Sequence, residues 1–458
     1  MSVLGPEIDR LEHLQPVRVV GRVAALRGLS VMVDDLRVPI GSLVRIGASR
    51  SSVLGEVVGF AREHTVVMLL GQTAGMRPGD PVACEQVAQT APVGDGLLGR
   101  IVDGLGRPID DRGPVRERVA RPIDPDPIGP MRRRRITEQL LTGVRAVDLM
   151  TPIGRGQRLG IFAGPGVGKS TLLGQMARET NADVSVVALI GERGREVRDF
   201  VEHALGEEGL ARSVVVVATG DESPLLRLRA AKLACTAAEH FRAEGRDVLL
   251  MMDSVTRFCH AQRQVGLTVG EPPATRGYTP SVFSQLALLL ERAGAVGSND
   301  GGGSITGMYT ILVEGDDTTE PISDAARGIL DGHLMLSRTL AQRGHYPAID
   351  VLDSVSRVAD DVVDTAHRAA RGQLARMLAT YRKVEDLVQI GAYARGSDPE
   401  ADVAIEFRGA INGLLTQTRG ERYEFAAAEK SMVELAMRTG EAVQRLTQMK
   451  QGPRRGGE

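Results

Sequence analysis

The chain has 458 residues, of which 42% are hydrophobic and 25% are charged, and its formal net charge is −2. This length is too great for one compact core, so we expect two or three domains of ordinary globular composition. The near-zero charge and the aromatic content of 3% argue against basic grooves and base-stacking surfaces, so no nucleic-acid partner is expected.

The three cysteines, Cys84, Cys235 and Cys259, lie far apart and form no Cys-x-x-Cys pair. This pattern is typical of buried free thiols in a reducing cytosol. The first residues lack the basic start and apolar core of a signal peptide, and no apolar run approaches the roughly 20 residues of a membrane span. We therefore expect a cytoplasmic protein.

The first segment, residues 1–16, carries Leu4, Ile8, Leu11 and Leu14 at spacings of three or four residues. This spacing predicts one apolar face on a short helix. Two partners fit that face: the domain that follows in the same chain, or a helix of another protein.

Residues 17–90 alternate short valine-rich runs with glycine-marked turns, for example Val17–Val23, Val31–Val33, Glu56–Phe60 and Thr65–Leu70. Short strands at close, regular spacing predict a small β-barrel. Further along, four prolines within Arg121–Pro130 mark an irregular connector. The four arginines that follow, Arg132 to Arg135, are interpreted as a solvated linker or as a contact for an acidic partner or lipid head groups.

Residues 91–358 alternate apolar runs with helical stretches such as Pro224–Glu244. Continuous apolar runs separated by helices predict a parallel sheet covered on both faces, with ligands at the carboxyl ends of its strands. The expected strands are Leu159–Ala163, Val184–Ile190, Val214–Ala218, Val248–Met252 and Tyr309–Val313.

The first of these strands leads into the most informative motif of the chain, the glycine-rich run 163–171. A helix-compatible stretch, Leu172–Arg178, follows it, and the order strand, glycine loop, helix is the context that a phosphate-binding loop requires. Ala163 replaces the usual first glycine of the motif. We predict a nucleoside triphosphate cradled by the backbone, with Lys169 on the β- and γ-phosphates and the Ser170 hydroxyl on Mg²⁺. The binding residues are Gly164, Pro165, Gly166, Val167, Gly168, Lys169, Ser170 and Thr171.

Groups suited to phosphoryl transfer follow two further strands. Glu192 and Arg193 come after Val184–Ile190, where the carboxylate can orient water and the guanidinium can neutralise phosphate charge. Asp253 follows Val248–Met252 at the Walker B position for Mg²⁺, and we expect Arg257, four residues on, to point into the same site near the phosphates. Each acid alone could be a helix cap, but together with the phosphate loop they predict a hydrolytic site.

From residue 359 the strand signals stop, and runs such as Ala370–Ile390 and Glu424–Met449 predict a helical domain over residues 359–450. Residues 451–458 are rich in glycine, arginine and proline, and we expect a disordered tail.

Several core motifs together resemble the ATPase of type III protein export, which powers flagellar assembly and has a sister form in injectisomes. Both are similar to the catalytic subunit of rotary ATP synthases. The resemblance covers nearly the whole chain and implies a barrel, a RecA-like P-loop domain and a helical domain. The motifs are Gly191-Glu-Arg-Gly-Arg-Glu-Val, Gly270-Glu-Pro-Pro-Ala-Thr-Arg-Gly-Tyr, Gly303-Ser-Ile-Thr, Val313-Glu-Gly-Asp-Asp, Asp331-Gly-His and Gly344-His-Tyr-Pro-Ala-Ile-Asp.

The resemblance implies roles that the residues alone do not give. Tyr346 matches the aromatic that stacks on adenine, with a core tyrosine as the alternative. Arg357 matches an arginine finger that enters the site of the neighbouring subunit, and such a head-to-tail contact must close into a ring. The family implies a homohexamer. Pro165 departs from the commonest rotary-enzyme loop, and Ser298–Gly302 forms a flexible-looking insert.

The resemblance also implies partners and a location. A stator protein is expected at residues 1–16, and a coiled-coil stalk is expected at the helical domain, near the loop that starts at Gly391. Export gate, chaperones and export substrates complete the set, with the protein in the cytoplasm and peripheral to the inner-membrane export apparatus. The expected activity is Mg²⁺-dependent ATP hydrolysis that drives export.

Other functions remain open at this stage. The export system is flagellar or an injectisome, since both share every motif. A catalytic subunit of a rotary synthase would alternate with a paralogue. A non-catalytic ring subunit would lack Glu192, and a nucleic-acid translocase would need more aromatic and basic surface.

Overall fold

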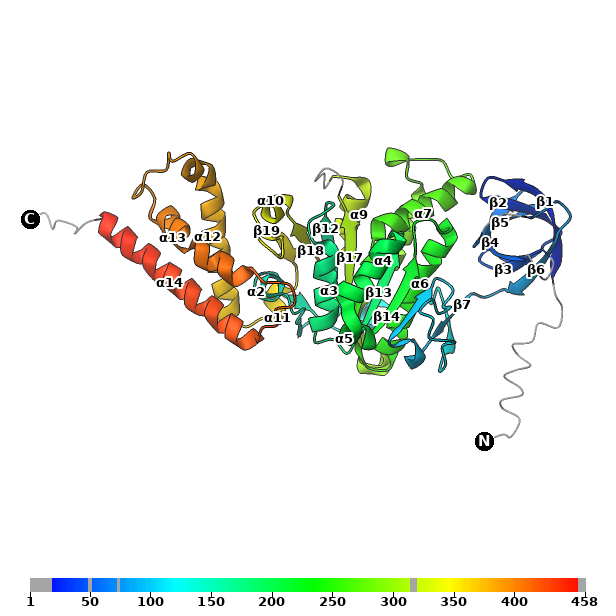
Figure 1. The fold of residues 1–458 in the computed structure, drawn as a ribbon, viewed down its shortest axis with the longest axis horizontal. Helices are drawn as coiled ribbons and strands as arrows, with labels where there is room; N and C mark the ends of the chain where they lie inside the picture. Colours follow the sequence, from blue (N-terminus) through cyan, green and yellow to red (C-terminus); the bar gives the residue numbers. More distant parts are fainter. Residues whose placement is uncertain (1–18, 48–51, 72–74, 314–318, 452–458) are drawn as a thin grey trace, which may run out of the picture.

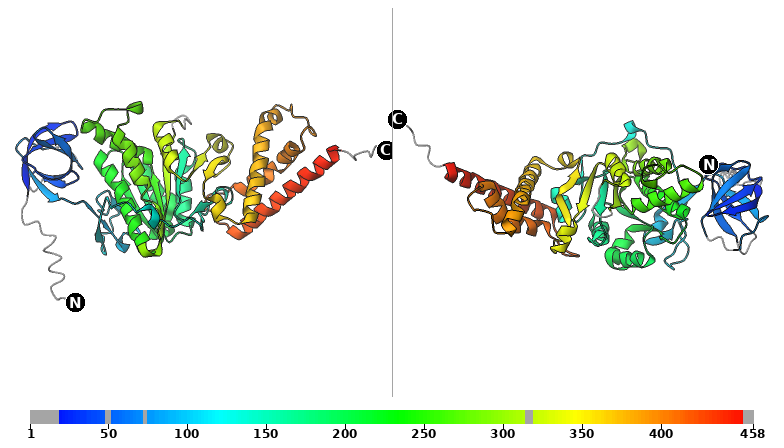
Figure 2. Two further views of the ribbon diagram at one scale, coloured as in Figure 1. Left: turned by 180° about the vertical axis from the view of Figure 1, so that it is seen from behind. Right: turned by 90° about the horizontal axis from the view of Figure 1, so that it is seen from above.

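The computed structural model describes residues 19–47, 52–71, 75–313 and 319–451. The described residues form three parts in a row along the longest axis: a β-barrel, a central sheet covered by helices, and a helical region (Figure 1). Two further views keep these parts in the same order (Figure 2). The predicted fold class is confirmed. The predicted apolar stripe at residues 4–14 and the end of the predicted tail, residues 452–458, lie outside the described residues.

The barrel closes through antiparallel neighbours in the order β1-β2-β5-β4-β3-β6. Its valine-rich strands turn alternate side chains inward, where Val31, Val44, Val57 and Val67 form a dry core. The strands are β1 Val20–Arg27, β2 Ser30–Asp34, β3 Leu43–Ile46, β4 Val53–Ala61, β5 His64–Leu69 and β6 Pro81–Gln86.

The central sheet has the order β19-β18-β12-β17-β15-β13-β14-β8. Neighbours from β18 to β8 are parallel, whereas the edge strand β19 and the short β16, beside β17, are antiparallel. The strands are β8 Arg100–Asp103, β12 Arg158–Ala163, β13 Val184–Ile190, β14 Ser213–Ala218, β15 Asp247–Asp253, β16 Gly294–Ala295, β17 Ser304–Leu312, β18 Gly332–Leu336 and β19 Ile349–Ser356.

Both faces of this sheet are buried, which is why its central strands read as continuous apolar runs. In β13, Val186 and Ala188 enter one core, whereas Val187 and Leu189 enter the other. Residues of α6 to α9 share the first core, and residues of α2, α3 and the C-terminal helices share the second. The helices of this part are α2 Arg145–Met150, α3 Lys169–Glu179, α4 Gly194–Asp199, α5 Gly206–Ala211, α6 Pro224–Ala243, α7 Val255–Thr268, α8 Pro280–Leu290, α9 Pro321–Ile329 and α10 Arg338–Gln342.

Short elements connect these units. The π-helical turn Phe200–Leu205 joins α4 to α5, and single 3₁₀ turns occur elsewhere. Two small antiparallel pairs flank the sheet, β7 Thr90–Val93 with β9 Val119–Pro122, and β10 Gln139–Leu140 with β11 Ile153–Gly154. After β9 the chain has no helix or strand until residue 130, so the predicted irregular connector is confirmed there, although β9 extends to its second residue.

Between residues 359 and 451 the regular elements are helical, as predicted. The long helices α12 and α14 pack together and against α13. The sequence interpretation found α12 and α14 to within a few residues and did not define α13. The helices are α11 Ala359–Val362, α12 Thr365–Gln389, α13 Pro399–Leu415 and α14 Phe425–Gln451.

The arginine run is largely exposed, in keeping with a solvated linker, and it also contacts this same chain. Arg132 forms an ion pair with Asp300, and Arg133 donates to the carbonyl of Ala293 at 2.8 Å. Arg135 lies 3.1 Å from Asp361. The insert Ser298–Gly302 contains the 3₁₀ turn Ser298–Asp300. Arg132 donates to Asp300 in this turn. These pairs form because the run lies beside residues 295–297, where Arg133 and Val296 make an isolated antiparallel bridge.

The three cysteines are buried and free, as predicted. Among the described residues, no helix combines the length and the apolar character that crossing a membrane requires.

Candidate active site

The phosphate loop, residues 164–168, connects β12 to α3 at the carboxyl end of the central sheet. Gly166 and Gly168 have φ angles of 78° and 89°, in the left-handed region that favours glycine. Gly168 caps α3 without a side-chain hydrogen bond, so the first amides of the helix are directed toward the loop. The positive end of an eleven-residue helix and these amides form an anion cradle.

The loop presents one face to solvent and packs the other. Gly164 and Val167 are buried, whereas Pro165, Gly166, Ser170 and Thr171 are exposed. The buried valine anchors the loop against the sheet. The exposed hydroxyls of α3 are therefore available at the mouth of the cradle.

Lys169, Glu192 and Asp253 converge beside the loop. The Lys169 ammonium forms an ion pair with the Asp253 carboxylate and lies 3.7 Å from Glu192 Oε1. Asp253 ends β15 and Glu192 follows β13, and these two strands are parallel neighbours. The carboxyl ends of parallel strands meet at one edge of the sheet. Lys169 and Asp253 therefore touch, although they are 84 residues apart in the sequence.

The environment of Glu192 favours its neutral form. Burial and the nearby charge of Asp253 raise the pKa of Glu192 to about 7, and Lys169 opposes that shift. A hydrogen bond with Glu196 contributes to this raised pKa of Glu192 and lowers the pKa of Glu196. A carboxylate with a pKa near neutrality is suited to proton transfer.

Two residues that support this cluster were not predicted. Thr310 Oγ1 in β17 donates to Asp253 Oδ1 at 2.7 Å and fixes that carboxylate. The sequence interpretation placed Thr310 inside a core strand and gave it no role. Glu196 was also missed, although an acidic residue in the first turn of a helix such as α4 is a favoured position.

The two arginines predicted near the γ-phosphate differ in position. Arg257 Nε lies 3.5 Å from Glu192 Oε1, so α7 brings this guanidinium into the cluster. The side chain of Arg193 is 80% exposed and pairs with Glu196 at 3.2 Å. The structure thus gathers Arg257 with the acids and leaves Arg193 at the surface.

Tyr346 lies beside the phosphate loop, which overturns the alternative of a core tyrosine. It is 44% exposed, and its Cε1 atom lies 3.6 Å from the place that a Cβ on Gly168 would occupy. A cavity of about 350 Å³ opens next to its phenol ring. The cavity is lined by the loop, by residues 344 and 346–348, and by residues 416–419 after α13.

The contribution of residues 416–419 was missed by sequence reasoning, because no local motif marks it. Gln417 is buried, and its N–H donates to the carbonyl of Tyr346 at 2.9 Å. Its side-chain amide donates to Gly143 at 3.0 Å and accepts from the N–H of Arg145 at 2.9 Å. The helical domain is thereby fixed to the wall of the cavity.

Arg357 lies away from this site. It follows the edge strand β19, where Ser356 pairs with Gly332 at the start of β18. β18 is parallel to β12, whose far end leads into the phosphate loop. Arg357 is exposed at the amino end of the sheet, so the structure does not bring it to the loop of its own chain.

Three family models match the chain. The β-barrel domain of the ATP synthase alpha/beta family matches residues 17–85, and its nucleotide-binding domain matches residues 143–356. The C-terminal domain of the type III secretion ATPase EscN matches residues 363–434. These matches follow the order of barrel, central sheet and helices.

Curated relatives align over most of the chain. A flagellum-specific ATP synthase from Treponema pallidum is 51% identical over 94% of this chain and 95% of that protein. A type 3 secretion system ATPase from Xanthomonas euvesicatoria is 49% identical over 87% and 89%. The structure of the assembled ATPase EscN with its central stalk EscO, from enteropathogenic E. coli, matches with a TM-score of 0.84 and 40% identity. That match covers 91% of this chain and 100% of the EscN chain. The chain therefore belongs to the family of flagellum-specific ATP synthases and type 3 secretion system ATPases.

Proposed function

We propose that this chain hydrolyses ATP to ADP and phosphate and thereby energises protein export through a flagellar-type, type III apparatus. The convergence of Lys169, Glu192 and Asp253 beside the phosphate loop carries the proposal. A loop that only bound nucleotide would not need a buried carboxylate whose pKa is raised to about 7.

The loop amides and Lys169 bind the phosphates, and Glu192 orients the attacking water and takes its proton. Lys169, which neutralises Asp253 in the chain alone, turns to the γ-phosphate when nucleotide binds. Tyr346 stacks on the adenine in the adjacent cavity. Arg257 neutralises charge on the γ-phosphate, and Arg193 acts at the rim of the site.

Mg²⁺ fits the oxygen donors that this site offers. The Ser170 hydroxyl is exposed at the start of α3, and the Asp253 carboxylate lies at the adjacent strand end. Within the described ranges no group of three His, Cys, Asp or Glu residues is placed to hold a metal ion. Mg²⁺ commonly takes one or two protein oxygens and completes its shell with phosphates and water, and it supplies charge neutralisation there.

Hydrolysis requires a neighbouring chain, because Arg357 acts as an arginine finger in the next site. The relative EscN is an assembled ATPase with a central stalk, and a homohexamer with a coiled-coil stalk at residues 359–450 extends that arrangement to this chain. Barrel 17–90 and ATPase domain 91–358 complete the protomer. Residues 1–16 take a stator, and the ring serves export gate, chaperones and substrates from the cytoplasm, peripheral to the membrane.

The catalytic part is tested by ATP turnover of the purified chain with and without Mg²⁺. We expect Lys169→Ala to abolish nucleotide binding and hydrolysis, and Glu192→Gln to bind ATP but to hydrolyse it about 10²–10⁴-fold more slowly. Equal turnover of Glu192→Gln and the unchanged chain would contradict the role of Glu192.

The export part is tested by affinity purification from the native bacterium, followed by mass spectrometry. Recovery of stator, stalk and export-gate proteins supports export, and their identities separate a flagellum from an injectisome. A paralogous ATPase subunit recovered in equal amount would instead indicate a rotary synthase and would overturn the homohexamer. A chain carrying Lys169→Ala serves as the control for contacts that do not depend on nucleotide.

A further inference from the structure

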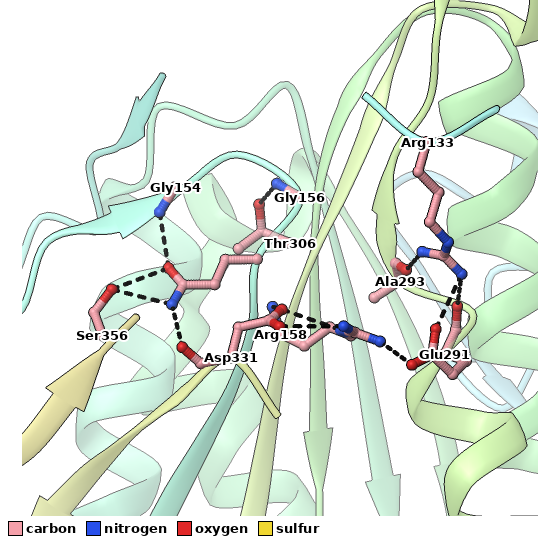
Figure 3. A network of polar contacts seen from close by, with 10 residues as sticks. Arg133, Gly154, Gly156, Arg158, Glu291, Ala293, Thr306, Asp331 and Ser356 are labelled. Atoms are coloured by element: carbon pink, nitrogen blue, oxygen red, sulfur yellow. Dashed lines mark hydrogen bonds and ion pairs between the residues drawn. The ribbon is translucent and has the colours of Figure 1, made fainter. Parts of the chain in front are cut away.

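A polar network that includes Arg158, Asp331 and Ser356 lies at the amino end of the central sheet (Figure 3). We infer that Asp331, held by Gln157 and Arg158, is a positioning residue for Arg357. The inference rests on the proposed function, in which Arg357 enters the site of the neighbouring chain. It assigns a role to the Asp331-Gly-His motif.

The main chain of Asp331 holds the backbone of Arg357 directly. The N–H of Arg357 donates to the Asp331 carbonyl at 2.9 Å. The same carbonyl accepts from Gln157 Nε2 at 3.1 Å, and that amide also donates to Ser356 Oγ at 3.0 Å. Gln157 is fully buried, and its own oxygen accepts from the N–H of Gly154 at 2.9 Å. One buried amide thus contacts Ser356 directly and Arg357 indirectly, through the Asp331 carbonyl to which both donate.

The side chain of Asp331 is fixed as firmly as its carbonyl. It accepts from the N–H, Nε and Nη2 of Arg158, each at 3.1 Å. A two-pronged pair between a guanidinium and a carboxylate fixes orientation as well as distance. Arg158 also pairs with Glu291, which Arg133 contacts at 3.2 Å (Figure 3). Arg133, one of the four arginines of the run, therefore belongs to this network.

At Gly332, strands β18 and β19 lie so close together that there is no room for a side chain. A Cβ on Gly332 would lie 2.3 Å from the carbonyl oxygen of Val355 and 3.0 Å from Cα of Ser356. Glycine lets β18 and β19 approach until the bond from Arg357 to Asp331 forms. Because Arg357 itself is exposed, this backbone support is what defines where its guanidinium can reach.

The experiment mixes two inactive variants, each of which keeps what the other lacks. Arg357→Ala chains keep an intact nucleotide site, and Lys169→Ala chains keep an intact finger. In a 1:1 mixture about one quarter of the head-to-tail contacts pair an intact site with an intact finger, so ATP turnover returns. The test adds Asp331→Ala to the Lys169→Ala chain, where it can act only through the neighbour.

We expect Lys169→Ala/Asp331→Ala chains to restore at least tenfold less turnover than Lys169→Ala chains, since displacement of a catalytic group by about 1 Å costs about 10²-fold. Lys169→Ala/Asp324→Ala is the matched control, because Asp324 is an exposed aspartate of α9. That control is expected to restore as much turnover as Lys169→Ala.

The outcomes separate the inference from the function on which it rests. Equal rescue by both double variants overturns the role of Asp331 and leaves the proposed function standing. If Lys169→Ala fails to rescue Arg357→Ala although mixed rings form, the finger between chains is wrong, and the inference falls with it. Ring formation is followed by light scattering. If Asp331→Ala prevents folding, Asp331→Asn replaces it, and rescue equal to that of Lys169→Ala counts against the inference.

Discussion

At the scale of single residues, the chemistry of the candidate active site depends on how its buried carboxylates, Glu192 and Asp253, are neutralised. Glu192 and Asp253 lie within reach of one ammonium, which cannot fully neutralise both. Thr310 donates to Asp253, while burial and the nearby Asp253 raise the pKa of Glu192 to about 7. A carboxyl group with a pKa near neutrality is suited to the role of base that we propose for Glu192.

The first prediction concerns the pH dependence of turnover. The base must be ionised, and the pKa of Glu192 is raised to about 7, so kcat/KM should rise with pH below about 7 and level off above it. Glu192→Gln should abolish this limb together with the activity. The measurement is ATP turnover at low substrate from about pH 5.5 to about pH 8.5, a range that brackets the titration of the base.

The control for this experiment is Glu207→Gln, because Glu207 is an exposed glutamate of α5. Its profile should match that of the unchanged chain. A profile with no inflection near neutrality would count against Glu192 as the base.

The second prediction concerns Tyr346. Stacking of an aromatic ring on a base contributes about 1–3 kcal/mol, so Tyr346→Ala should weaken ATP binding about tenfold or more. Tyr346→Phe keeps the ring and should bind as the unchanged chain does. Binding is measured by titration with a fluorescent ATP analogue in the Glu192→Gln background. Equal losses in both variants would mean that the hydroxyl, and not stacking, supports the nucleotide.

At the scale of elements, α2 connects the nucleotide cavity to the helical domain. Arg145 in α2 donates to Thr416 at 2.6 Å and pairs with Glu421 at 2.9 Å. Asp148, in the same helix, is fully buried and accepts the Tyr423 hydroxyl at 2.5 Å. The segment between α13 and α14 is thus fixed at several points to the helix that precedes β12.

The third prediction follows from this buried carboxylate. Burial raises the pKa of Asp148 to about 6, against hydrogen bonds from Tyr423, Thr142 and Gly143. Tyr423→Phe removes one donor to the ionised form and should destabilise the protein by about 1–3 kcal/mol at pH 8. The raised pKa means that Asp148 becomes neutral in the folded protein below about pH 6, so the loss should be smaller at pH 5.

The measurement is the urea midpoint of each variant at the two pH values. Tyr393→Phe is the matched control, because its hydroxyl also donates to an aspartate, Asp402, at 3.1 Å, but at a half-buried position where its loss should cost less. A Tyr423→Phe deficit that is the same at both pH values would show that Asp148 does not titrate as inferred.

At the scale of the whole molecule, the finger and the loop lie at opposite ends of the strands of one chain. β12 carries Arg158 at its start and enters the phosphate loop at its end, and Arg357 lies level with the start. If Arg357 is the finger that we propose, one chain cannot complete its own site. A head-to-tail contact between chains would then supply Arg357 to the neighbouring loop.

The fourth prediction concerns protein concentration. Turnover per chain should rise steeply as rings form, because a finger contributes about 10³–10⁵ in rate. Arg357→Ala should flatten that rise and leave nucleotide binding unchanged. Turnover and light scattering are measured together over a dilution series. Full turnover in samples that contain only monomers would rule out the shared site.

The sequence predicted those parts of the fold in which burial leaves a continuous trace. β13 and β15 are apolar along their length because both faces of the sheet are covered, and each was found nearly in full. The start of β17 was missed because Ser304, Thr306 and Gly307 break its apolar run. The edge strands β8 and β19 and the inner strand β18 were missed because each mixes buried with partly exposed residues and so leaves no continuous apolar run.

The candidate active site also divides into residues that have a local sequence signal and residues that only the tertiary structure brings together. The glycine loop with Lys169 and Ser170 could be found by sequence alone, because adjacent residues build it with their own backbone. Glu192 and Asp253 could be inferred because parallel strands end at one edge. Only the tertiary structure showed that Thr310 contacts Asp253, that Gln417 contacts Tyr346 and that Asp331 contacts Arg357. These contacts join segments whose separation in the chain carries no local signal, so packing alone decides them.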